Sequence, residues 1–183
     1  IGSVNFSSMQ VNSTGTKTFL GTTNVSGILT LSSGTVHLND NVMLRVFNAY
    51  TQTGGDVTVG VNAKLSAWYH FNQSAGTIAR LEINGNDFAN ISQTGGTVGD
   101  FEYAASGFKT LNTNLTVTGN YLHSTGSNFF SGASGVKIIL SGNMTAGSGA
   151  AFSLVEFAGT GNQNLNQQFG SLYDIQVDKA SGT

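Results

Sequence analysis

Apolar residues recur along this chain in a short phrase that returns six times. The phrase begins with an apolar residue, has glycine five positions later and usually a β-branched residue two positions after that. Its copies are LTLSSGTV (29–36), YTQTGGDV (50–57), FNQSAGTI (71–78), ISQTGGTV (91–98), YLHSTGSN (121–128) and MTAGSGAA (144–151). The starts are separated by 21, 21, 20, 30 and 23 residues. A period near twenty with glycine at a fixed phase is typical of a solenoid.

Aligning the phrases places like residues in columns. The glycines are expected at corners where the backbone takes a positive φ or approaches a neighbour closely. These glycines are Gly34, Gly55, Gly76, Gly96, Gly126 and Gly149. A hydroxyl column is predicted for Ser32, Thr53, Ser74, Thr94 and Ser124. A β-branched column is predicted for Val36, Val57, Ile78 and Val98, and apolar residues alternate after it, which indicates strands with one buried face.

Two further columns are predicted if one inserted residue is allowed in the later turns. Leu44 and Leu65 share an apolar position, which Phe88 and Phe108 take in the longer turns. A column whose amides hydrogen-bond from coil to coil is expected for Asn41, Asn62 and Asn84. Each turn then adds one layer of about 4.8 Å to the stack.

A larger symmetry links distant parts of the chain. STGTKTFLGTTNVSG (13–27) aligns without a gap on ASGFKTLNTNLTVTG (105–119), and IQVDKASGT (175–183) repeats the opening MQVNSTGT (9–16) with one residue inserted. We therefore expect residues 1–183 to form one domain, a module of a longer tandem array. The predicted fold is all-β, a parallel β-solenoid of about eight coils of roughly 21 residues. The usual handedness of β crossovers favours a right-handed β-helix.

Composition narrows the function classes. The chain has 25 Gly, 9% charged residues and no Pro or Cys, so a disulfide framework, a thiolate nucleophile and a cysteine zinc site are excluded. A net charge of −2 gives no basic footprint for nucleic acid. No apolar stretch approaches the roughly 18 residues of a membrane helix, so membrane insertion is not expected. The opening IGSVNFSSMQ has no initiator Met, and we expect a mature product or a piece of a longer protein.

Several segments resemble a known family. FAGTGNQNLNQQFGSLYDIQVDKASGT (157–183), the QTGGTV phrases and the LTVTGN segment resemble the repeats of large secreted surface proteins and adhesins of Bacteroidota, exported by the type IX system. The resemblance implies a repetitive outer-surface filament or adhesin that touches surfaces and polysaccharides. It would place the protein outside the cell or on its surface.

β-Solenoids also include enzymes that act on acidic polysaccharides, so catalytic residues were sought. Asp100 and Glu102 are two apart and would share one strand face, a spacing suited to general acid and base work or to cation binding. No basic residue or second carboxylate pair recurs in the aligned columns, which favours a solvated pair. The three histidines fall in different columns, so no zinc site is expected from His37, His70 and His123. The segments NDN (39–41) and NGND (84–87) have turn chemistry and complete no calcium spacing.

The segment Trp68-Tyr69-His70 contains the only Trp of the chain. If it is extended, one of its two aromatic rings faces outward and can stack on a sugar. The alternative is that Trp68 fills a corner of the core and Tyr69 caps it. An ice-binding surface is not expected, because the column that would form it is interrupted by an acid: Thr35, Asp56, Thr77 and Thr97.

The sequence therefore predicts a non-catalytic, extracellular structural or adhesive module without cofactor or metal. Its expected partners are a second copy stacked head to tail or a neighbouring repeat module, together with surface polysaccharide. The alternative is a carbohydrate-active or carbohydrate-binding β-helix protein that uses Asp100 and Glu102.

Overall fold

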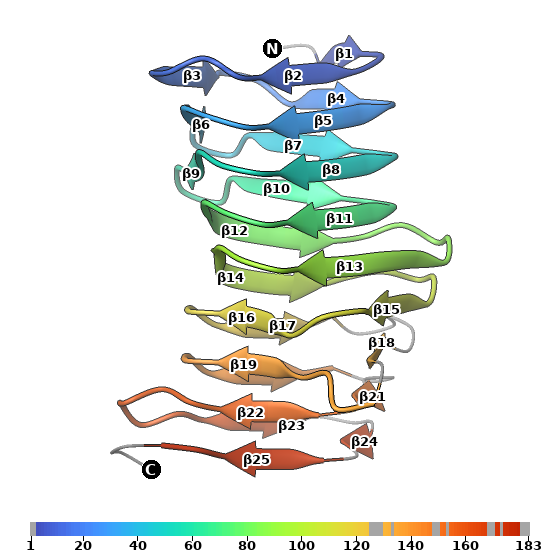
Figure 1. The fold of residues 1–183 in the computed structure, drawn as a ribbon, viewed down its shortest axis with the longest axis vertical. Helices are drawn as coiled ribbons and strands as arrows, with labels where there is room; N and C mark the ends of the chain where they lie inside the picture. Colours follow the sequence, from blue (N-terminus) through green and yellow to red (C-terminus); the bar gives the residue numbers. More distant parts are fainter. Residues whose placement is uncertain are drawn as a thin grey trace.

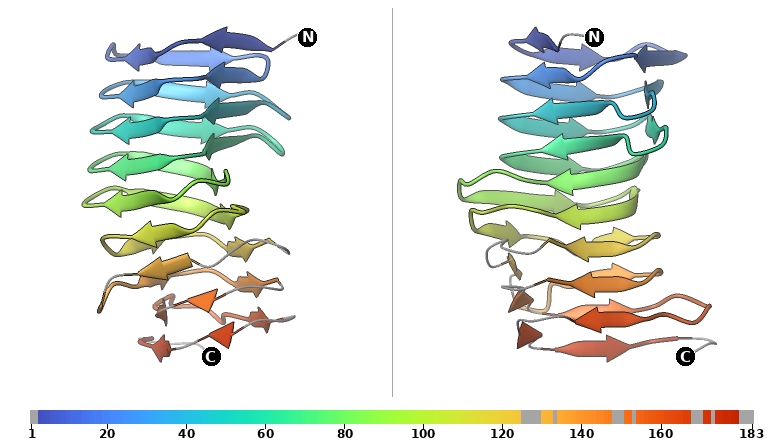
Figure 2. Two further views of the ribbon diagram at one scale, coloured as in Figure 1. Left: turned by 90° about the vertical axis from the view of Figure 1, so that its right-hand side faces the viewer. Right: turned by 180° about the vertical axis from the view of Figure 1, so that it is seen from behind.

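The computed structural model describes residues 3–124, 130–132, 134–147, 151–152, 154–167, 171–172 and 174–179. Within these residues every regular element is a strand, β1 to β25, and all the strand pairs are parallel (Figure 1). Successive coils are stacked along the long axis of the molecule, and both views of Figure 2 show this layering. The near strands of Figure 1 run leftward and the far strands rightward as the chain descends, so the solenoid is right-handed. About eight turns of roughly 20 residues confirm the predicted fold.

Three faces enclose the core, and each coil contributes a strand to each face. Face 1 holds β1 (Val4–Phe6), β4 (Thr23–Val25), β7 (Met43–Val46), β10 (Lys64–Ala67), the end of β12 (Thr77–Ile83), the end of β14 (Thr97–Tyr103), β17 (Tyr121–His123), β20 (Met144–Ala146) and β23 (Leu165–Gln167). Face 2 holds β2 (Met9–Val11), β5 (Ile28–Leu31), β8 (Ala49–Gln52), β11 (His70–Gln73), β13 (Ala89–Gln93), β15 (Lys109–Leu111), β18 (Phe130–Gly132), β21 (Ala151–Phe152) and β24 (Ser171–Leu172).

Face 3 holds β3 (Thr16–Phe19), β6 (Thr35–Leu38), β9 (Asp56–Val59), the starts of β12 and β14, β16 (Leu115–Val117), β19 (Ile138–Leu140), β22 (Val155–Phe157) and β25 (Ile175–Val177). The first corner joins face 1 to face 2, the second joins face 2 to face 3, and the third returns the chain to face 1. β12 and β14 pass straight through the third corner, which is why faces 1 and 3 are linked into one sheet.

The core is made of apolar ladders, because strands in register place every inward side chain over its equivalent in the next coil. The β-branched column is confirmed on face 3, where it continues beyond the predicted residues as Val36, Val57, Ile78, Val98, Val117, Leu140 and Phe157. All of these side chains are buried. Tyr50 and Phe71 stack inside face 2 with ring centroids 5.7 Å apart.

The six phrases do not occupy one face. The first four begin on face 2, where Leu29, Tyr50, Phe71 and Ile91 are paired in succession. The last two begin on face 1, where Tyr121 pairs with Phe101 above it and Met144 below it. One coil takes the chain from Ile91 to Leu111 on face 2, and it then crosses face 3 to reach Tyr121 on face 1, so the spacing of 30 residues is one coil plus two faces. Ser124 consequently lies outside the hydroxyl column of the first four phrases.

The two columns that assumed an inserted residue are only partly correct. Leu44 pairs with Leu65 as predicted, but the next residue of that ladder is Leu81. At β12 the third corner becomes shorter, because the strand runs through it without a break. The first corner that follows, between β12 and β13, contains more residues than the one between β10 and β11. The number of residues per coil therefore stays nearly the same. This exchange places Phe88 and Phe108 at the first corner, outside the leucine ladder.

The asparagine ladder stops at the same exchange. Asn62 Nδ2 donates to Asn41 Oδ1 at 3.2 Å, and both residues have a positive φ, 59° at Asn41 and 58° at Asn62. Asn84 lies at the first corner, where its backbone N–H donates to the carbonyl oxygen of Ala67. The prediction is thus confirmed for two residues and wrong for the third.

The glycine column follows the second corner. Gly34, Gly55, Gly76 and Gly96 have φ of 77°, 70°, 77° and 81°, which favours glycine. Gly15, with φ of 86°, begins the column one coil earlier. A Cβ on Gly76 would lie 1.9 Å from the carbonyl oxygen of Gly55, so close approach adds a second requirement. The remaining predicted members, Gly126 and Gly149, lie outside the described residues.

A glutamine ladder inside this corner was missed by the sequence interpretation. Gln52, Gln73 and Gln93 are buried, with 0%, 2% and 6% exposure. Gln73 Nε2 donates to Gln52 Oε1 at 3.3 Å, and Gln93 Nε2 donates to Gln73 Oε1 at 2.8 Å. Gln73 Nε2 also donates to the carbonyl oxygen of Gly76 at 3.1 Å, so the ladder ties the glycine corner to the core. A buried amide is stable here because its polar atoms have partners.

The end-to-beginning match joins segments on different faces. Ile175–Val177 is β25 on face 3, whereas Met9–Val11 is β2 on face 2. Lys17 and Lys109, which align in the longer match, also differ, because Lys17 is exposed on face 3 and Lys109 is buried on face 2. The similar sequences therefore reflect the shared chemistry of a strand followed by a corner.

Gly76→Ala should lower the free energy of unfolding by roughly 1–3 kcal/mol, because the new Cβ would meet a backbone oxygen in a left-handed conformation. Gly15→Ala is the matched control: it has a similar φ but no heavy atom within 4 Å of the added Cβ. Its loss should be smaller, since only the conformational strain remains. Urea unfolding followed by circular dichroism measures both. Equal losses would show that close approach contributes nothing.

Candidate functional site

Charged side chains gather on the outer surface of face 1, where three coils contribute one member each. Lys64 is on β10, Glu82 on β12 and Glu102 on β14. Lys64 Nζ donates to a carboxylate oxygen of Glu82 and, at 3.0 Å, to Oε2 of Glu102. Arg80 Nη2 lies 3.9 Å from the same Glu102 oxygen. One lysine thus holds two carboxylates that stacking would otherwise place against each other.

Glu82 is the most enclosed member of this charged cluster, with 4% exposure. Its carboxylate also accepts from Ser66 Oγ at 2.7 Å and Asn84 Nδ2 at 3.1 Å. Burial alone would raise the pKa of Glu82, but the hydrogen bonds from Lys64, Ser66 and Asn84 outweigh it and lower the pKa. Burial likewise disfavours the charge on Lys64, and its bonds to the two carboxylates reverse this and raise its pKa.

Asp100 and Glu102 share the outer side of β14, as their spacing predicts. Asp100 is exposed and accepts from the backbone N–H of Asn120 at 2.9 Å. A shallow hollow of about 180 Å³ lies between them, lined by Arg80, Asp100, Phe101, Glu102, Asn120 and Leu122. Glu102 is engaged by two cations and by Ser124 Oγ at 3.1 Å. Both carboxylate oxygens of Glu102 therefore have hydrogen-bond partners within the protein, which suits structural support better than contact with a substrate.

The sequence interpretation missed the basic residues of this network. Lys64 and Arg80 belong to one outward column that continues with Asp100, but the exchange of corner lengths between them hides the alignment. An alignment of the strands by their pairing, and not by the starts of the phrases, places Lys64, Arg80 and Asp100 in one column.

The histidines lie apart, as expected. His37 Nδ1 contacts Thr58 Oγ1 at 2.9 Å on face 3, and His70 Nδ1 accepts from the backbone N–H of Asn90 at 3.3 Å on face 2. His123 is buried inside face 1, where its Nδ1 lies 3.2 Å from the hydroxyl of Tyr121. Among the described residues, no group of three His, Asp or Glu side chains is placed to hold a metal ion.

The two oxygen-rich turns use their side chains for the turns themselves. Asp40 Oδ1 accepts from the backbone N–H of Val61 at 2.8 Å, which links one third corner to the next. Asn84 Oδ1 accepts from the backbone N–H of Gly85 at 2.7 Å. Both oxygens are therefore used in local structure.

Trp68, Tyr69 and His70 lie at the first corner, and all three are half-buried on its outer side. The Trp68 ring centroid is 4.8 Å from that of Phe47, and its Nε1 donates to Ser66 Oγ at 3.1 Å. Tyr69 meets His70 edge to face, with centroids 4.2 Å apart. The ring of Trp68 thus covers the outside of the corner, which differs from the alternative that it fills the core.

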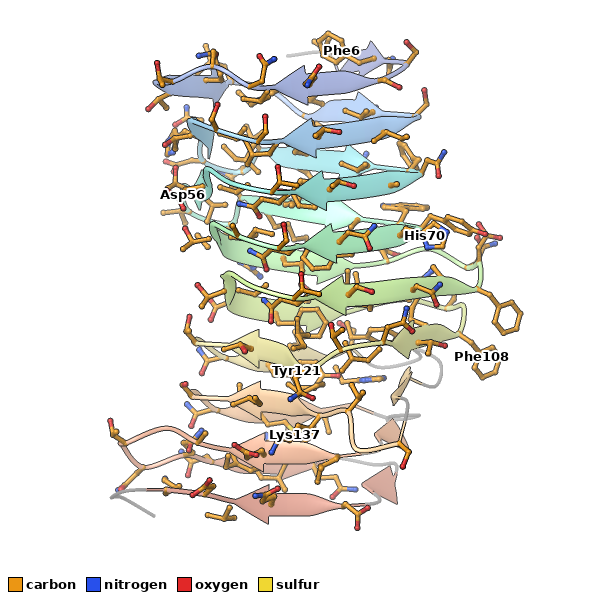
Figure 3. The ribbon with its side chains drawn as sticks, in the orientation of Figure 1. Phe6, Asp56, His70, Phe108, Tyr121 and Lys137 are labelled. Atoms are coloured by element: carbon orange, nitrogen blue, oxygen red, sulfur yellow. The ribbon has the colours of Figure 1, made fainter. Side chains whose placement is uncertain are left out.

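Two more aromatic rings extend this feature along the same corner. Phe88 and Phe108 are 73% and 45% exposed and stack with centroids 5.4 Å apart at an interplanar angle of 13°. Figure 3 shows Phe108 and neighbouring rings projecting from this edge. We call Phe47, Trp68, Tyr69, Phe88 and Phe108 the aromatic corner. The recurrence of aromatics at positions 47, 68, 88 and 108 was a visible sequence signal for it.

A buried lysine supports the aromatic corner from inside. Lys109 has 0% exposure, and its Nζ donates to the backbone carbonyl oxygens of Trp68 at 3.0 Å and Asp87 at 2.7 Å. The ammonium therefore joins three successive coils. Burial lowers the pKa of Lys109, and the charge of Asp87 opposes this. Tyr103 adds a bond from its hydroxyl to the carbonyl oxygen of Gly107 at 3.1 Å.

No protein-family model, no curated protein and no solved structure matches this chain. Within the part of the chain that the structure describes, there is no helix of the length and apolar character needed to cross a membrane.

Glu82→Gln should lower the free energy of unfolding at pH 7 by roughly 1–3 kcal/mol, because Lys64 loses a charged hydrogen-bond partner. Folding lowers the pKa of Glu82 below its ordinary 4.5. The contribution of Glu82 to the free energy of unfolding is therefore complete above that pH and is lost as the pH falls through the lowered pKa. Folding raises the pKa of Lys64 above 10.5, so its contribution is lost only as the pH rises through the raised pKa.

Denaturant unfolding across a pH series measures both effects. The variant should show a flatter dependence on the acid side, and the exposed-site control Asp100→Asn should change little. An acid limb that is equally steep with and without Glu82 would contradict the assigned role.

Proposed function

We propose that the chain is a non-catalytic structural and adhesive module of an extracellular surface protein. The observation that supports this proposal is the charged cluster on face 1. There the carboxylate of Glu102, one of the two candidate catalytic residues, contacts Lys64 and Arg80. A general acid or base must come within hydrogen-bond reach of its substrate, and the two oxygens of Glu102 are already bonded to Lys64 and to Ser124. The resemblance to repetitive surface adhesins agrees with this proposal.

Stacking with further coils is part of the proposal. The last described coils leave apolar side chains exposed around a hollow of about 210 Å³ lined by Phe157, Gln163, Leu165, Ile175, Val177 and Lys179. At the other end Val4 and Phe6 are 51% and 41% exposed. An open strand edge with apolar neighbours is a template for another strand. We infer that a coil of like geometry covers each end, from a neighbouring module or from a second copy.

Copies that stack head to tail make a heterologous contact that does not close, so a filament grows. Purified protein should associate as its concentration rises, with a subunit repeat of about 40 Å, from about eight layers at about 4.8 Å each. Val177→Lys should prevent association, because it places a charge on the open end. Analytical ultracentrifugation and electron microscopy report the outcome.

Val61→Lys is the matched control, because Val61 and Val177 are 67% and 68% exposed but Val61 lies on the side of the stack, at the third corner. It should leave association unchanged. A wild-type chain that stays monomeric at every concentration, or equal effects of the two lysines, would refute end-to-end stacking.

A carbohydrate-active enzyme is the second candidate, favoured by the hollow beside Asp100 and Glu102. Reducing-end assays on acidic and neutral polysaccharides, with and without Ca²⁺, distinguish it. Under the proposed function no cleavage occurs, and the double variant Asp100→Asn with Glu102→Gln behaves as the wild type does. Cleavage that disappears in the double variant would establish the enzyme instead.

A further inference from the structure

The aromatic corner is not required by the solenoid. One coil earlier the same corner is formed by Ser26 and Gly27, whose backbone makes the equivalent bond to the coil above. The fold therefore accepts small residues where Phe47 and Trp68 stand. Large exposed rings add apolar surface in contact with water, which opposes solubility and marks binding surfaces in soluble proteins. A ligand that covers the rings explains their presence.

An uncharged polar strip runs along face 2, and one outward column lies between it and the aromatic corner: Ile28, Ala49, His70, Asn90 and Thr110. The outward residues of the strip follow one another from coil to coil, at half-buried or exposed positions: Thr30, Thr51, Asn72, Ser92 and Asn112. A hollow of about 120 Å³ lies on this strip between Thr51, Asn72 and Ser92. Hydroxyl and amide groups both donate and accept hydrogen bonds, as the hydroxyl groups of a sugar do. The strip carries no charge that would select an ionic ligand.

The rings are held in place before any ligand arrives. Lys109 binds the backbone of Trp68 and of Asp87, the residue that precedes Phe88. Phe88 and Phe108 stack on each other, and Trp68 packs on Phe47. Binding therefore orders few side chains, which lowers its entropic cost.

We propose that the aromatic corner and the polar strip of face 2 bind an extended, uncharged glycan that lies along the solenoid axis. The strand spacing of about 4.8 Å is close to the length of one sugar unit in an extended chain, so successive coils meet successive sugars. Ring edges and faces contact the apolar C–H surfaces of the sugars, and the strip bonds to their hydroxyls. The proposal rests on the adhesive function and names the ligand class at this site.

Other occupants fit less well. An acidic polymer would need cations on the outer surface, and Lys109, which bonds to the backbone of Trp68, is buried with both its described bonds directed to backbone oxygens. A protein partner usually needs a broad apolar centre ringed by polar groups. Here the exposed rings follow one corner of the stack, and the outward side chains of face 2 beyond them are mostly polar.

Binding of cellohexaose, chitohexaose and a polygalacturonate hexamer to the intact chain tests the proposal. Calorimetry gives the affinities, and fluorescence localises the site, because Trp68 is the only tryptophan. We expect at least one neutral oligosaccharide to bind and to shift the Trp68 emission, while the acidic hexamer does not bind.

Phe88→Ala combined with Phe108→Ala should lower the affinity for the neutral oligosaccharide by about tenfold. Leu20→Ala is the control, because Leu20 is 66% exposed at the third corner, away from the aromatic corner. Circular dichroism and melting confirm that each variant is folded. Asn72→Ala, which keeps all the rings, should also weaken binding, because the polar strip bonds to the sugar hydroxyls, and an unchanged affinity would overturn the strip's part in the proposal.

The proposal is overturned if no neutral glycan binds, if the acidic hexamer binds more tightly, or if the double variant binds as the wild type does. Self-association that the phenylalanine variants abolish would assign the corner to a second copy and would also overturn it. Failure of the adhesive function is separate, because it appears as polysaccharide cleavage, whereas failure here leaves a non-catalytic chain without this ligand.

Discussion

Parallel hydrogen bonding between coils is the constraint from which the rest of the structure follows. Because each strand is in register with the strands above and below it, every side chain has an equivalent about 4.8 Å away. Apolar side chains satisfy this easily and form the core ladders. Polar groups must bond along the stack, as Gln52, Gln73 and Gln93 do. Where charges of one sign repeat in register, as those of Glu82 and Glu102 do, a cation must bond to both, and Lys64 does so.

The same constraint explains how much the sequence revealed. A fixed register converts a position in the coil into a period in the sequence, so the face 3 column and the four described members of the glycine column were predictable residue by residue. Gly34, Gly55, Gly76 and Gly96 take the expected positive φ. Val36, Val57 and Ile78 pair as their alignment indicates. The solenoid and its size were therefore predictable without any related protein.

The predictions that failed involve corners. The three faces have the same local chemistry, so a phrase can move from face 2 to face 1 between Ile91 and Tyr121 without a break in the pattern. Residues can also be lost from the third corner and gained at the first corner without a change in the length of the coil. This exchange is why the predicted positions of Asn84 and Phe88 were wrong. Lys109 shows the physical reason most clearly. A lysine is expected at the surface, but two successive first corners enclose carbonyl oxygens that bind its ammonium, one from Trp68 and one from Asp87.

Function follows from what the stack leaves unconstrained. Inward positions are selected by packing and corner glycines by backbone geometry, so neither carries information about a partner. Outward positions are free to vary, and here they separate into a charged cluster on face 1 and an uncharged polar strip beside exposed rings on face 2. The charged cluster satisfies itself, since Glu82 and Glu102 are both bonded within it. The rings of Phe88 and Phe108 contact each other yet remain exposed, so among the described side faces the aromatic corner offers apolar surface that no intramolecular contact covers completely.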